Sequence, residues 1–364
     1  MIIVFTSNFE GGIVQFAIQL SSSLQNLGEQ VICYLPNNSI VSLGDFPKDK
    51  VFYYEKTNTI NLTSSRLQLL AVELSHHEPE FIWFVDEAII CSQLIVLLEP
   101  IKSILTIHDP LPHPTNSVSV RQKLHDLYSF FIRKKALKRV QVSVLLSENS
   151  LRTFLKGYNY HGQCALLPLG AHVPKVIGER PNEIDKYDNF FLFFGRIDKY
   201  KNISILIRAY MSMSGIENIT PLVIAGKGRL TDEENSLIAE SNNIILINRY
   251  ISDSEMVWLF SHANSIILPY LEATQSGVIP IAYHFGVPVI TSNVEGLSEF
   301  VENGRTGFVC NTIDDYKESM IKLSDNTYIQ KFKPLIKSYY ENRFNWSKNL
   351  TAVLDITRNK STIR

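Results

Sequence analysis

Two cationic side chains follow a short aromatic stretch in the second half of the sequence. Arg196 and Lys201 stand in the segment FFLFFGRIDKYKN, just beyond the point near Gly195 where a strand is expected to end. A guanidinium and an ammonium group directed at one point can hold a diphosphate and neutralise its charge as it leaves. Two solvated surface cations are the alternative interpretation. The pattern favours chemistry with a diphosphate leaving group.

A polar turn further along the chain offers a second place for an anion. Residues 268–291, LPYLEATQSGVIPIAYHFGVPVIT, predict a strand, a turn, a helix and another strand. The turn contains Thr274, Gln275, Ser276 and Gly277. Its successive backbone N–H groups suit a phosphate, and Thr274 or Ser276 can also cap the helix. Pro280 is tolerated in the first turn of a helix, which supports this helix start. A capped helix without a ligand is the alternative.

Two glycines follow the first apolar segment of the chain. Gly11 and Gly12 come after the predicted strand IIVFTS and before a predicted helix over residues 14–27, which Gly28 is placed to end. Glycines let a backbone approach a ligand, and the N-terminus of a helix favours an anion. The G-x-G-x-x-G fingerprint of dinucleotide binding is absent. The turn therefore predicts either a phosphate contact or simply a tight connection.

A histidine stands where another strand is expected to end. His108 and Asp109 follow the apolar segment SILTI, and a proline-rich stretch containing His113 comes next. A histidine at such an edge can hydrogen-bond a sugar hydroxyl or transfer a proton, although most histidines do neither. His113 is an equal candidate for that role. We take His108 as the candidate catalytic residue, and Asp109 and His113 as candidate contacts to an acceptor.

A carboxylate follows the predicted strand VPVIT. Glu299 lies in the segment VEGLSE, where its two oxygens could accept hydrogen bonds from two sugar hydroxyl groups. A glutamate in the first turn of a helix, favoured there by the helix dipole, is the alternative interpretation.

A basic run lies beside aromatic residues in the first half of the sequence. It consists of Arg133, Lys134, Lys135, Lys138 and Arg139, next to Phe130 and Phe131. Basic and aromatic side chains together can rest on an anionic membrane surface. The solvated face of a helix is the commoner explanation, so peripheral membrane contact stays an alternative.

Short apolar runs alternate with amphipathic segments over the whole chain, which is the pattern of βα units around parallel sheets. In the first half, strands are predicted near residues 2–6, 30–34, 81–85, 103–107 and 142–146. The polar stretch 174–189 separates two series of similar size. We expect an α/β fold with two Rossmann-like domains, residues 1–173 and 174–344, and a ligand between their C-terminal strand edges. The tail 345–364 has the apolar spacing of one amphipathic helix.

Charge and composition exclude several classes of protein. With 364 residues and a formal net charge of −1, the chain lacks the basic excess of a nucleic-acid binder. Its four cysteines form no C-x-x-C pair, so four buried thiols are expected rather than a zinc ribbon or redox motif. There is no membrane-spanning run and no signal peptide, so a cytoplasmic location is expected. The D-x-D, Walker A, H-E-x-x-H and G-x-S-x-G motifs are absent, and no catalytic metal is expected.

Five segments follow one another in a recognisable order. They are FFGRIDKYKNISILIRAY, PLVIAGKG, ISDSEMVWLFSHANSIILPY, ATQSG with AYHFGVPVIT, and EGLSEFVENGRTGFV. In this order they resemble glycosyltransferase family 4, whose members are retaining, nucleotide-sugar-dependent enzymes with the two-domain GT-B fold. The resemblance is dense over residues 190–310. It is looser before them, where GG at 11–12 and TIHDPLPHP at 106–114 still fit.

The resemblance implies roles for individual residues. Arg196 and Lys201 would bind the donor diphosphate and stabilise it as the leaving group, and His108 would approach the donor sugar. The backbone of residues 275–277 would contact sugar or phosphate, and the last helix would cross back onto the first domain. The candidate donor contacts are Gly11, Gly12, Gly195, Gly226, Thr274, Gln275, Ser276, Gly277 and Glu299. No cofactor is implied beyond the co-substrate, a UDP- or GDP-sugar.

One motif of the family is missing. The usual E-x7-E motif would place glutamates at Ala273 and Ile281, and neither residue is acidic. The ATQSG turn is similar to a variant found in some bacterial members, so the usual hydroxyl contacts cannot be carried over. We predict transfer of a hexose-type sugar to a saccharide or lipid-linked acceptor, in cell-surface polysaccharide synthesis and with retention. A non-catalytic homologue acting as a partner subunit, or a sugar-nucleotide epimerase, is the alternative. The missing G-x-G-x-x-G disfavours a nicotinamide-dependent dehydrogenase.

Overall fold

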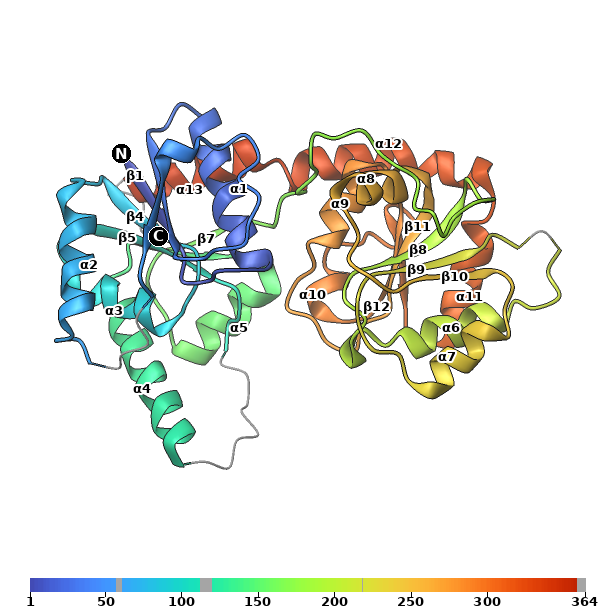
Figure 1. Cartoon of the computed structure of the whole chain (residues 1–364), viewed down its shortest axis with the longest axis horizontal. Coiled ribbons are helices and arrows are strands. Elements are labelled where there is room, and N and C mark those ends of the chain that lie inside the picture. The colour runs from blue at the N-terminus through green and yellow to red at the C-terminus, as the bar shows by residue number, and fades with distance from the viewer. Residues whose placement is uncertain (57–60, 112–119, 218, 359–364) are drawn as a thin grey trace. The chain divides into compact units, whose positions relative to one another are not determined.

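The chain folds into two compact units (Figure 1). The computed structural model describes residues 1–56, 61–111, 120–217 and 219–358. One unit contains Met1–Pro168 together with Trp346–Arg364, and the other contains Leu169–Asn345. Each unit is built on a parallel sheet with helices around it, so the predicted α/β class is confirmed.

The first unit has a seven-stranded sheet in the order β3-β2-β1-β4-β5-β6-β7, in which every neighbouring pair is parallel. Its elements are β1 Ile2–Phe5, α1 Gly12–Asn26, β2 Val31–Pro36, η1 Lys48–Lys50, β3 Val51–Tyr54, α2 Ser65–His76, β4 Phe81–Phe84, α3 Ile89–Leu97, β5 Lys102–Ile107, α4 Val120–Leu137, β6 Val142–Leu145, α5 Glu148–Tyr158, β7 Cys164–Leu166 and α13 Trp346–Arg358. Helices α2, α3 and α4 pack in succession, whereas α1 packs against α13 (Figure 1). The sheet is therefore covered on both faces, as its continuous apolar strands require.

Two strands of this sheet were not predicted from the sequence. The five predicted strands correspond to β1, β2, β4, β5 and β6, but β3 and β7 at the two edges were missed. β7 has three residues, and β3 is partly exposed, with Tyr53 54% accessible. Edge strands are short and only partly buried, so they lack the long apolar run that identifies a central parallel strand.

The second unit has a six-stranded parallel sheet in the order β10-β9-β8-β11-β12-β13. Its elements are β8 Phe190–Phe194, η2 Lys199–Lys201, α6 Ile203–Met211, β9 Leu222–Ala225, α7 Asp232–Ala239, β10 Ile244–Ile247, α8 Asp253–His262, β11 Ala263–Leu268, α9 Val278–His284, β12 Val289–Ser292, α10 Glu295–Ser298, β13 Gly307–Cys310, α11 Ile313–Lys322 and α12 Asn326–Arg343. Local hydrogen bonds fix several helix starts. The side chains of Thr231 and Ser252 each accept a hydrogen bond from the backbone N–H of a glutamate three residues later. The carboxylate of that glutamate accepts in turn from the backbone N–H of Thr231 or Ser252, and the two bonds form a capping box.

The last described helix belongs to the first unit. The indole Nε1 of Trp346 donates to the carbonyl of Pro168 at 2.9 Å. At the far end of α13, Arg358 forms ion pairs with Glu29 at 2.8 Å and with Glu80 at 2.9 Å. The predicted amphipathic helix is confirmed, because Leu350, Val353 and Leu354 are buried along one face.

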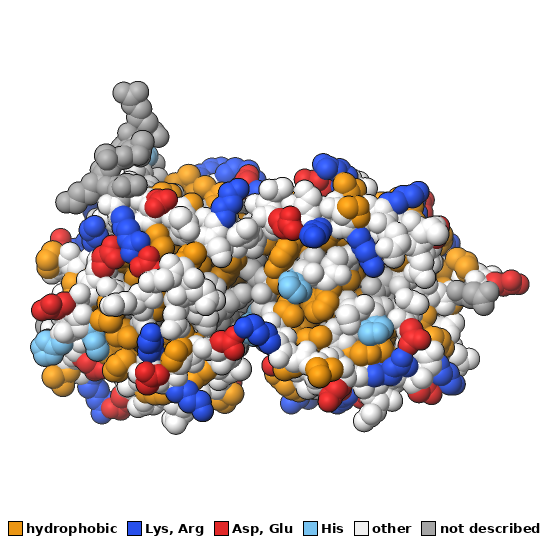
Figure 2. Space-filling view, turned by 90° about the horizontal axis from the view of Figure 1, so that it is seen from above, with side chains coloured by type: hydrophobic (Ala, Val, Ile, Leu, Met, Phe, Trp, Pro, Cys, Tyr) orange, Lys and Arg blue, Asp and Glu red, His pale blue; other side chains and the backbone are white. Residues whose placement is uncertain are grey.

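Charges of both signs are dispersed over the surface. Figure 2 shows cationic and anionic side chains interspersed on the face in view, in agreement with 35 Lys and Arg against 36 Asp and Glu. Within the described residues, no helix is long and apolar enough to cross a bilayer. Three cysteines are buried as expected, but Cys164 is only half-buried because it begins the short edge strand β7.

Candidate functional site

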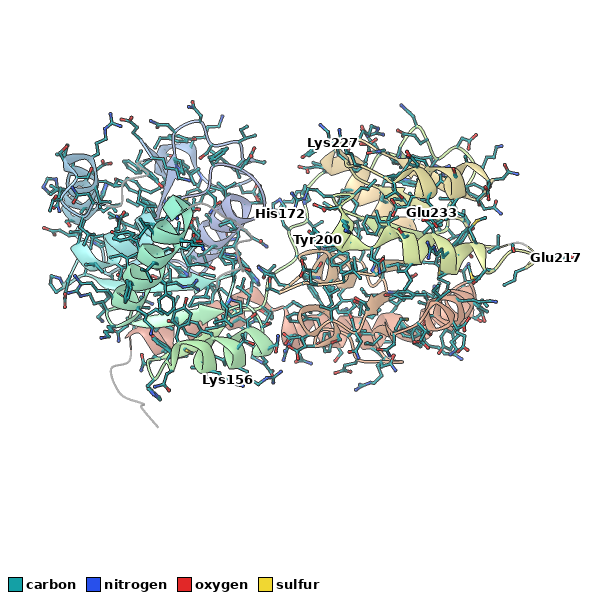
Figure 3. The ribbon with its side chains drawn as sticks, turned by 90° about the horizontal axis from the view of Figure 1, so that it is seen from below. Lys156, His172, Tyr200, Glu217, Lys227 and Glu233 are labelled. Atoms are coloured by element: carbon teal, nitrogen blue, oxygen red, sulfur yellow. The ribbon has the colours of Figure 1, made fainter. Side chains whose placement is uncertain are left out.

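The strand order of the second unit brings two of the predicted segments together. The chain runs outward from β8 to β9 and β10 and then returns to β11 on the other side of β8. Loops diverge at such a switch point and leave a place for a ligand at the carboxyl edge of the sheet. Here the backbone N–H of Leu271, after β11, donates to the carbonyl of Tyr200, after β8, at 2.8 Å. Tyr200 and Lys227 lie at this end of the sheet, and Glu217 lies at the other (Figure 3).

Two predicted donor-binding glycines meet backbone to backbone. Gly195 donates to the carbonyl of Ala225 at 3.0 Å, and Gly226 follows directly. A Cβ atom on Gly226 would lie 1.9 Å from the Gly195 carbonyl oxygen, and both glycines have positive φ, 146° and 132°. Only glycine fits such a position. Gly226 therefore serves the close approach of the two loops. A Cβ on Gly195 would meet open space, so a ligand can approach there.

Lys201 and Arg196 both lie in the segment that follows β8. The Lys201 ammonium lies 3.5 Å from the centre of the Tyr270 ring and 4.8 Å from that of Tyr200. Burial, and then repulsion by Arg196, lower the pKa of Lys201 from its ordinary 10.5 to about 7, with Asp198 opposing. Arg196 itself is exposed. A partly desolvated ammonium that is repelled by a nearby guanidinium would be stabilised by a bound anion.

The ATQSG turn, residues 273–277, follows closely after Tyr270, the ring that the Lys201 ammonium meets. The hydroxyl of Ser276 accepts a hydrogen bond from the N–H of Val278, the first residue of α9, at 3.3 Å. Gly277 precedes that helix, is exposed, and has open space where a Cβ would be. The predicted helix start is confirmed, with Ser276 rather than Thr274 bonded to it. Thr274 and Gln275 are half-buried in the same turn.

A glycine after β12 closes against the same turn. A Cβ on Gly296 would lie 2.2 Å from the carbonyl oxygen of Ala273. Glu299, three residues later, is half-buried at the carboxyl end of the four-residue helix α10. The interpretation of Glu299 as a first-turn glutamate is therefore wrong, because the helix starts four residues earlier at Glu295. Its predicted contact with a hydroxyl group stays a prediction.

In the first unit, His108 is fixed at the end of β5. The residue is 8% exposed, and its Nε2 lies 2.8 Å from the carbonyl oxygen of Val85. Because a carbonyl only accepts, Nε2 carries the proton in this bond. The imidazole also meets the ring of Phe16 edge to face at 5.6 Å, and Phe16 meets Trp346 in the same way. The histidine is thus oriented by β4, α1 and α13 together.

A carboxylate that sequence reasoning missed holds the same loop. The two oxygens of Glu87 accept from the backbone N–H groups of His108 at 3.2 Å and of Asp109 at 2.9 Å. Arg133, only 5% exposed, lies 3.9 Å from Glu87 and donates to the carbonyl of Asp109 at 2.9 Å. Glu87 and Arg133, which we call the loop clamp, therefore fix the backbone that carries His108. The sequence signal was available, since an acidic pair follows the predicted strand 81–85.

The other member of that acidic pair is a buried hub. Asp86 is 3% exposed and accepts from the N–H of Ser7 at 2.7 Å, the Ser7 hydroxyl at 2.8 Å and the Thr6 hydroxyl at 2.9 Å. Burial and the Asp86 carboxylate raise the pKa of the Cys91 thiol well above its ordinary value. Asp86 ties the exit of β1 to the exit of β4, the two strands at the switch point of the first sheet.

The glycine turn of the first unit is open to solvent. Gly11 is the N-cap of α1 with φ 83°, and both Gly11 and Gly12 are exposed with no atom near the position of a Cβ. The turn before a helix is confirmed, whereas the anion contact stays a prediction. Asp109 is half-buried. His113 lies outside the described residues.

The basic run divides into two kinds of side chain. Arg133 is buried in the loop clamp, and Arg139 pairs with Glu99 at 2.7 Å. Lys134, Lys135 and Lys138 are exposed. The interpretation of the whole run as one surface face is therefore wrong for Arg133, whereas Arg139 is partly exposed. Elsewhere in the described part of the chain, no three His, Cys, Asp or Glu side chains gather as metal ligands.

Comparison with known proteins bears on the second unit most directly. Residues 188–326 match the family model described as "Glycosyl transferases group 1". The chain is 31% identical to the capsular polysaccharide biosynthesis glycosyltransferase CapM of Staphylococcus aureus over 34% of this chain and 33% of that one. It is 24% identical to the O-antigen chain mannosyltransferase B of Escherichia coli over 58% of each. The matches thus cover about a third to three-fifths of these relatives.

Solved structures share the fold over almost the whole chain. A sucrose-phosphate synthase from Thermosynechococcus elongatus aligns with a TM-score of 0.71 and 16% identity, covering 98% of both chains. Anabaena HepE in complex with UDP-glucose aligns with a TM-score of 0.70 and 14% identity over 98% of this chain and 99% of that one. The predicted GT-B fold class is confirmed by this likeness.

Proposed function

We propose that the chain is a glycosyltransferase, starting from the match of residues 188–326 to the Glycosyl transferases group 1 family model. It moves a hexose-type sugar from a UDP- or GDP-sugar to a saccharide or lipid-linked acceptor. The observation that carries this proposal is Lys201, a half-buried ammonium whose pKa is lowered to about 7 beside Arg196. Such a pair favours a ligand with closely spaced negative charges, and a diphosphate has them.

The proposed reaction retains the configuration of the anomeric carbon. The acceptor hydroxyl oxygen forms a bond to the anomeric carbon while the bond between that carbon and the donor phosphate oxygen breaks. The electron pair leaves with the nucleoside diphosphate, and the hydroxyl proton passes to a phosphate oxygen. Charge builds up on the diphosphate as the sugar becomes oxocarbenium-like, and Arg196 and Lys201 neutralise it without a metal. In this proposal His108, held by the loop clamp, contacts the donor sugar.

The proposed biological setting is cell-surface polysaccharide synthesis. It is supported by similarity to a capsular polysaccharide glycosyltransferase and to an O-antigen mannosyltransferase. The structure of HepE with UDP-glucose supports a nucleotide-sugar as the class of donor.

Helix α4 supports a further part of the proposal, peripheral contact with a membrane. Leu124, Leu127 and Phe131 are 63%, 52% and 61% exposed along this helix. Exposed lysines follow them at its carboxyl end. An apolar stripe next to cations is the pattern of helices that lie on anionic membranes. We place the enzyme in the cytoplasm, at the inner face of the cell membrane.

One observation favours a second candidate, a non-catalytic homologue that acts as a partner subunit. Ala273 and Ile281, where the family's glutamates are expected, are half-buried and pack against the apolar core. No carboxylate can take their place without repacking. A binder of this kind would keep nucleotide affinity and release no sugar.

A thermal-shift panel of UDP, GDP, ADP and their sugar conjugates, with NAD as control, tests the donor site. We expect stabilisation by one diphosphate nucleotide and its loss in Arg196→Ala. Arg208→Ala is the matched control, since this guanidinium is 52% exposed on α6 and pairs only with Glu233 among the described residues. In a turnover assay, Arg196→Ala should lose about 10²–10³-fold. Full activity in folded Arg196→Ala contradicts the assignment, and binding without turnover at any acceptor favours the second candidate.

A further inference from the structure

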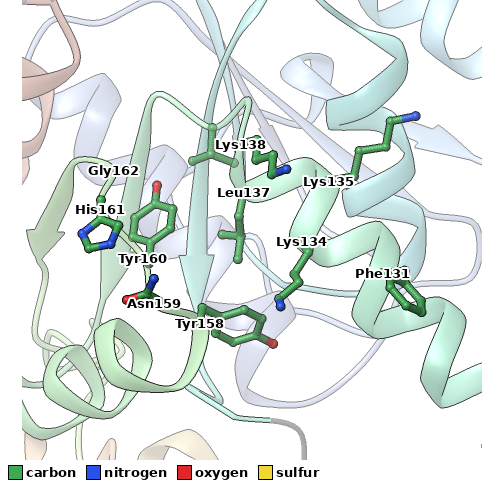
Figure 4. Close-up of a pocket in the computed structure, with 11 residues that line it drawn as sticks. Phe131, Lys134, Lys135, Leu137, Lys138, Tyr158, Asn159, Tyr160, His161 and Gly162 are labelled. Atoms are coloured by element: carbon green, nitrogen blue, oxygen red, sulfur yellow. The ribbon is translucent and has the colours of Figure 1, made fainter.

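A cavity of about 860 Å³ lies in the first unit, between the carboxyl end of α4 and the segment that joins α5 to β7 (Figure 4). Its volume is within the range of about 300–1,000 Å³ that is usual for small-molecule sites. Strands β6 and β7 begin beside it, whereas His108 follows the end of β5. The cavity therefore lies toward the edge of the sheet where β6 and β7 begin, and its lining residue Tyr158 also meets Arg133 of the loop clamp, whose guanidinium is 5.2 Å from the centre of the Tyr158 ring.

The wall of the cavity carries cations and no anion. Lys134, Lys135, Lys138 and His161 line it, and no acidic residue does. The Lys134 ammonium points toward Tyr158, whereas Lys135 points away and His161 lies on the far side of Tyr160 (Figure 4). Within the described residues none of the three ammonium groups has an ion pair, although Lys134 lies 4.7 Å from the centre of the Phe130 ring. Last-turn lysines suit the dipole of α4. The dipole does not account for His161, which comes from the other wall.

The rest of the lining is apolar and aromatic. Leu137, Val140, Tyr158 and Tyr160 contribute to it. Tyr158 is 8% exposed, and its hydroxyl has no hydrogen-bond partner among the described residues. That hydroxyl points toward the side of Lys134 (Figure 4). A buried hydroxyl without a partner costs free energy, so a ligand oxygen that accepts from it would be favoured.

Both walls are held in place without a ligand. Helix α5 ends at Tyr158 with Asn159 as its C-cap residue at φ 46°, and the N–H of Tyr160 donates to the carbonyl of Leu155 at 3.1 Å. The Tyr160 hydroxyl accepts from Ser143 at 3.1 Å. On the other side, the Arg139 ion pair with Glu99 anchors the end of α4. Because these walls are already ordered, binding of a ligand would cost little conformational entropy of the protein.

We infer that this cavity binds a phosphate ester that carries an apolar group. The phosphate would lie at the Lys134 ammonium and the Tyr158 hydroxyl, and the apolar part would lie against Leu137 and Tyr160. This chemistry has two sources, a soluble ester and the headgroup region of an anionic lipid. The lipid source rests on the proposed membrane contact, whereas binding of a soluble ester does not depend on transferase activity.

The test uses the full-length chain and dihexanoylphosphatidylglycerol below its micelle concentration, measured by calorimetry. We expect wild type to bind the ester more tightly than inorganic phosphate. The double variant Lys134→Gln/Lys138→Gln should bind the ester at least about tenfold more weakly than wild type. Lys135→Gln removes the same kind of charge from the same helix but points away, so it should bind like wild type. Tyr158→Phe should weaken binding a few-fold. Arg196→Ala should bind the ester normally, which separates this site from the donor site.

Vesicles with and without phosphatidylglycerol identify the source. If the double variant loses vesicle binding and Lys135→Gln keeps it, the ligand is a lipid. If both variants bind vesicles equally while only the double variant loses the monomeric ester, the ligand is soluble. The inference is overturned if the ester does not bind, if Lys135→Gln weakens its binding as much as the double variant, or if inorganic phosphate binds equally well.

Discussion

Binding of a diphosphate donor should draw a proton onto Lys201. In the free protein the pKa of this lysine is about 7, because its ammonium is buried against Tyr270 and repelled by Arg196. A bound diphosphate offsets that repulsion and returns the pKa toward its ordinary 10.5. At pH 8 only about a tenth of the free lysine is charged, so binding should take up about 0.9 proton. The bound state then holds more protons than the free state.

The sign of the pH dependence follows from this uptake. Affinity should be level below about pH 7 and should fall about tenfold per pH unit between pH 7.5 and 9.5, since each further unit removes the proton from more of the free protein. A nucleotide-sugar suits the measurement, because both of its phosphates are esters and neither titrates in this window. The assay is calorimetry at pH 8 in two buffers of different ionisation enthalpy, with the dissociation constant followed from pH 6 to 9.5.

Lys201→Arg is the matched control for this experiment. Arginine keeps its charge throughout the window, so the variant should bind with neither proton uptake nor the fall in affinity. The reasoning is refuted if wild type binds at pH 8 without taking up a proton. It is equally refuted if Lys201→Arg shows the same slope as wild type, because another group would then carry the proton.

Three further outcomes follow from the packing. Lys201→Met should raise the melting temperature more at pH 6 than at pH 10. Because the pKa of Lys201 is depressed in the folded state, wild type loses stability as the pH falls from 10.5 toward 7, and the variant removes that loss. Glu87→Gln should lower kcat about tenfold without changing donor affinity, since one carboxylate oxygen that accepts from a backbone N–H is replaced by an NH₂ donor. An unchanged kcat in steady-state kinetics would argue against the loop clamp. Gly226→Ala should lower the free energy of unfolding, measured in urea, by about 2 kcal/mol or more, because its Cβ would meet the Gly195 carbonyl. Gly277→Ala, where a Cβ would meet open space, should change the free energy of unfolding by less than about 0.5 kcal/mol. Equal effects of the two substitutions would contradict the packing argument.

Local sequence signals were sufficient for most of the secondary structure. Central parallel strands such as FFLFF and IIVF are continuous apolar runs because both faces are covered, and this makes them recognisable without a partner. Helix α8 also begins with a local signal, a capping box formed by residues three apart. The edge strands β3 and β7 were missed because their burial depends on neighbours that are distant in the sequence.

The candidate site shows the same division. The residue types of Arg196 and Lys201, and their position after a strand, predict a diphosphate site, and that role stays a prediction. The sequence also determined that helix α13 is amphipathic and that no glutamate stands at residue 273 or 281.

Only the tertiary structure decided the pKa of Lys201 and the orientation of His108. Lys201 and Tyr270 are far apart in the chain, and they meet because parallel register places the ends of β8 and β11 at one edge of the sheet. Glu87 reaches the backbone of His108 for the same reason, through the neighbouring strands β4 and β5. The pKa of a lysine and the orientation of a histidine depend on burial and on nearby dipoles and charges. Those quantities are properties of the assembled strand ends and have no signature in any single segment.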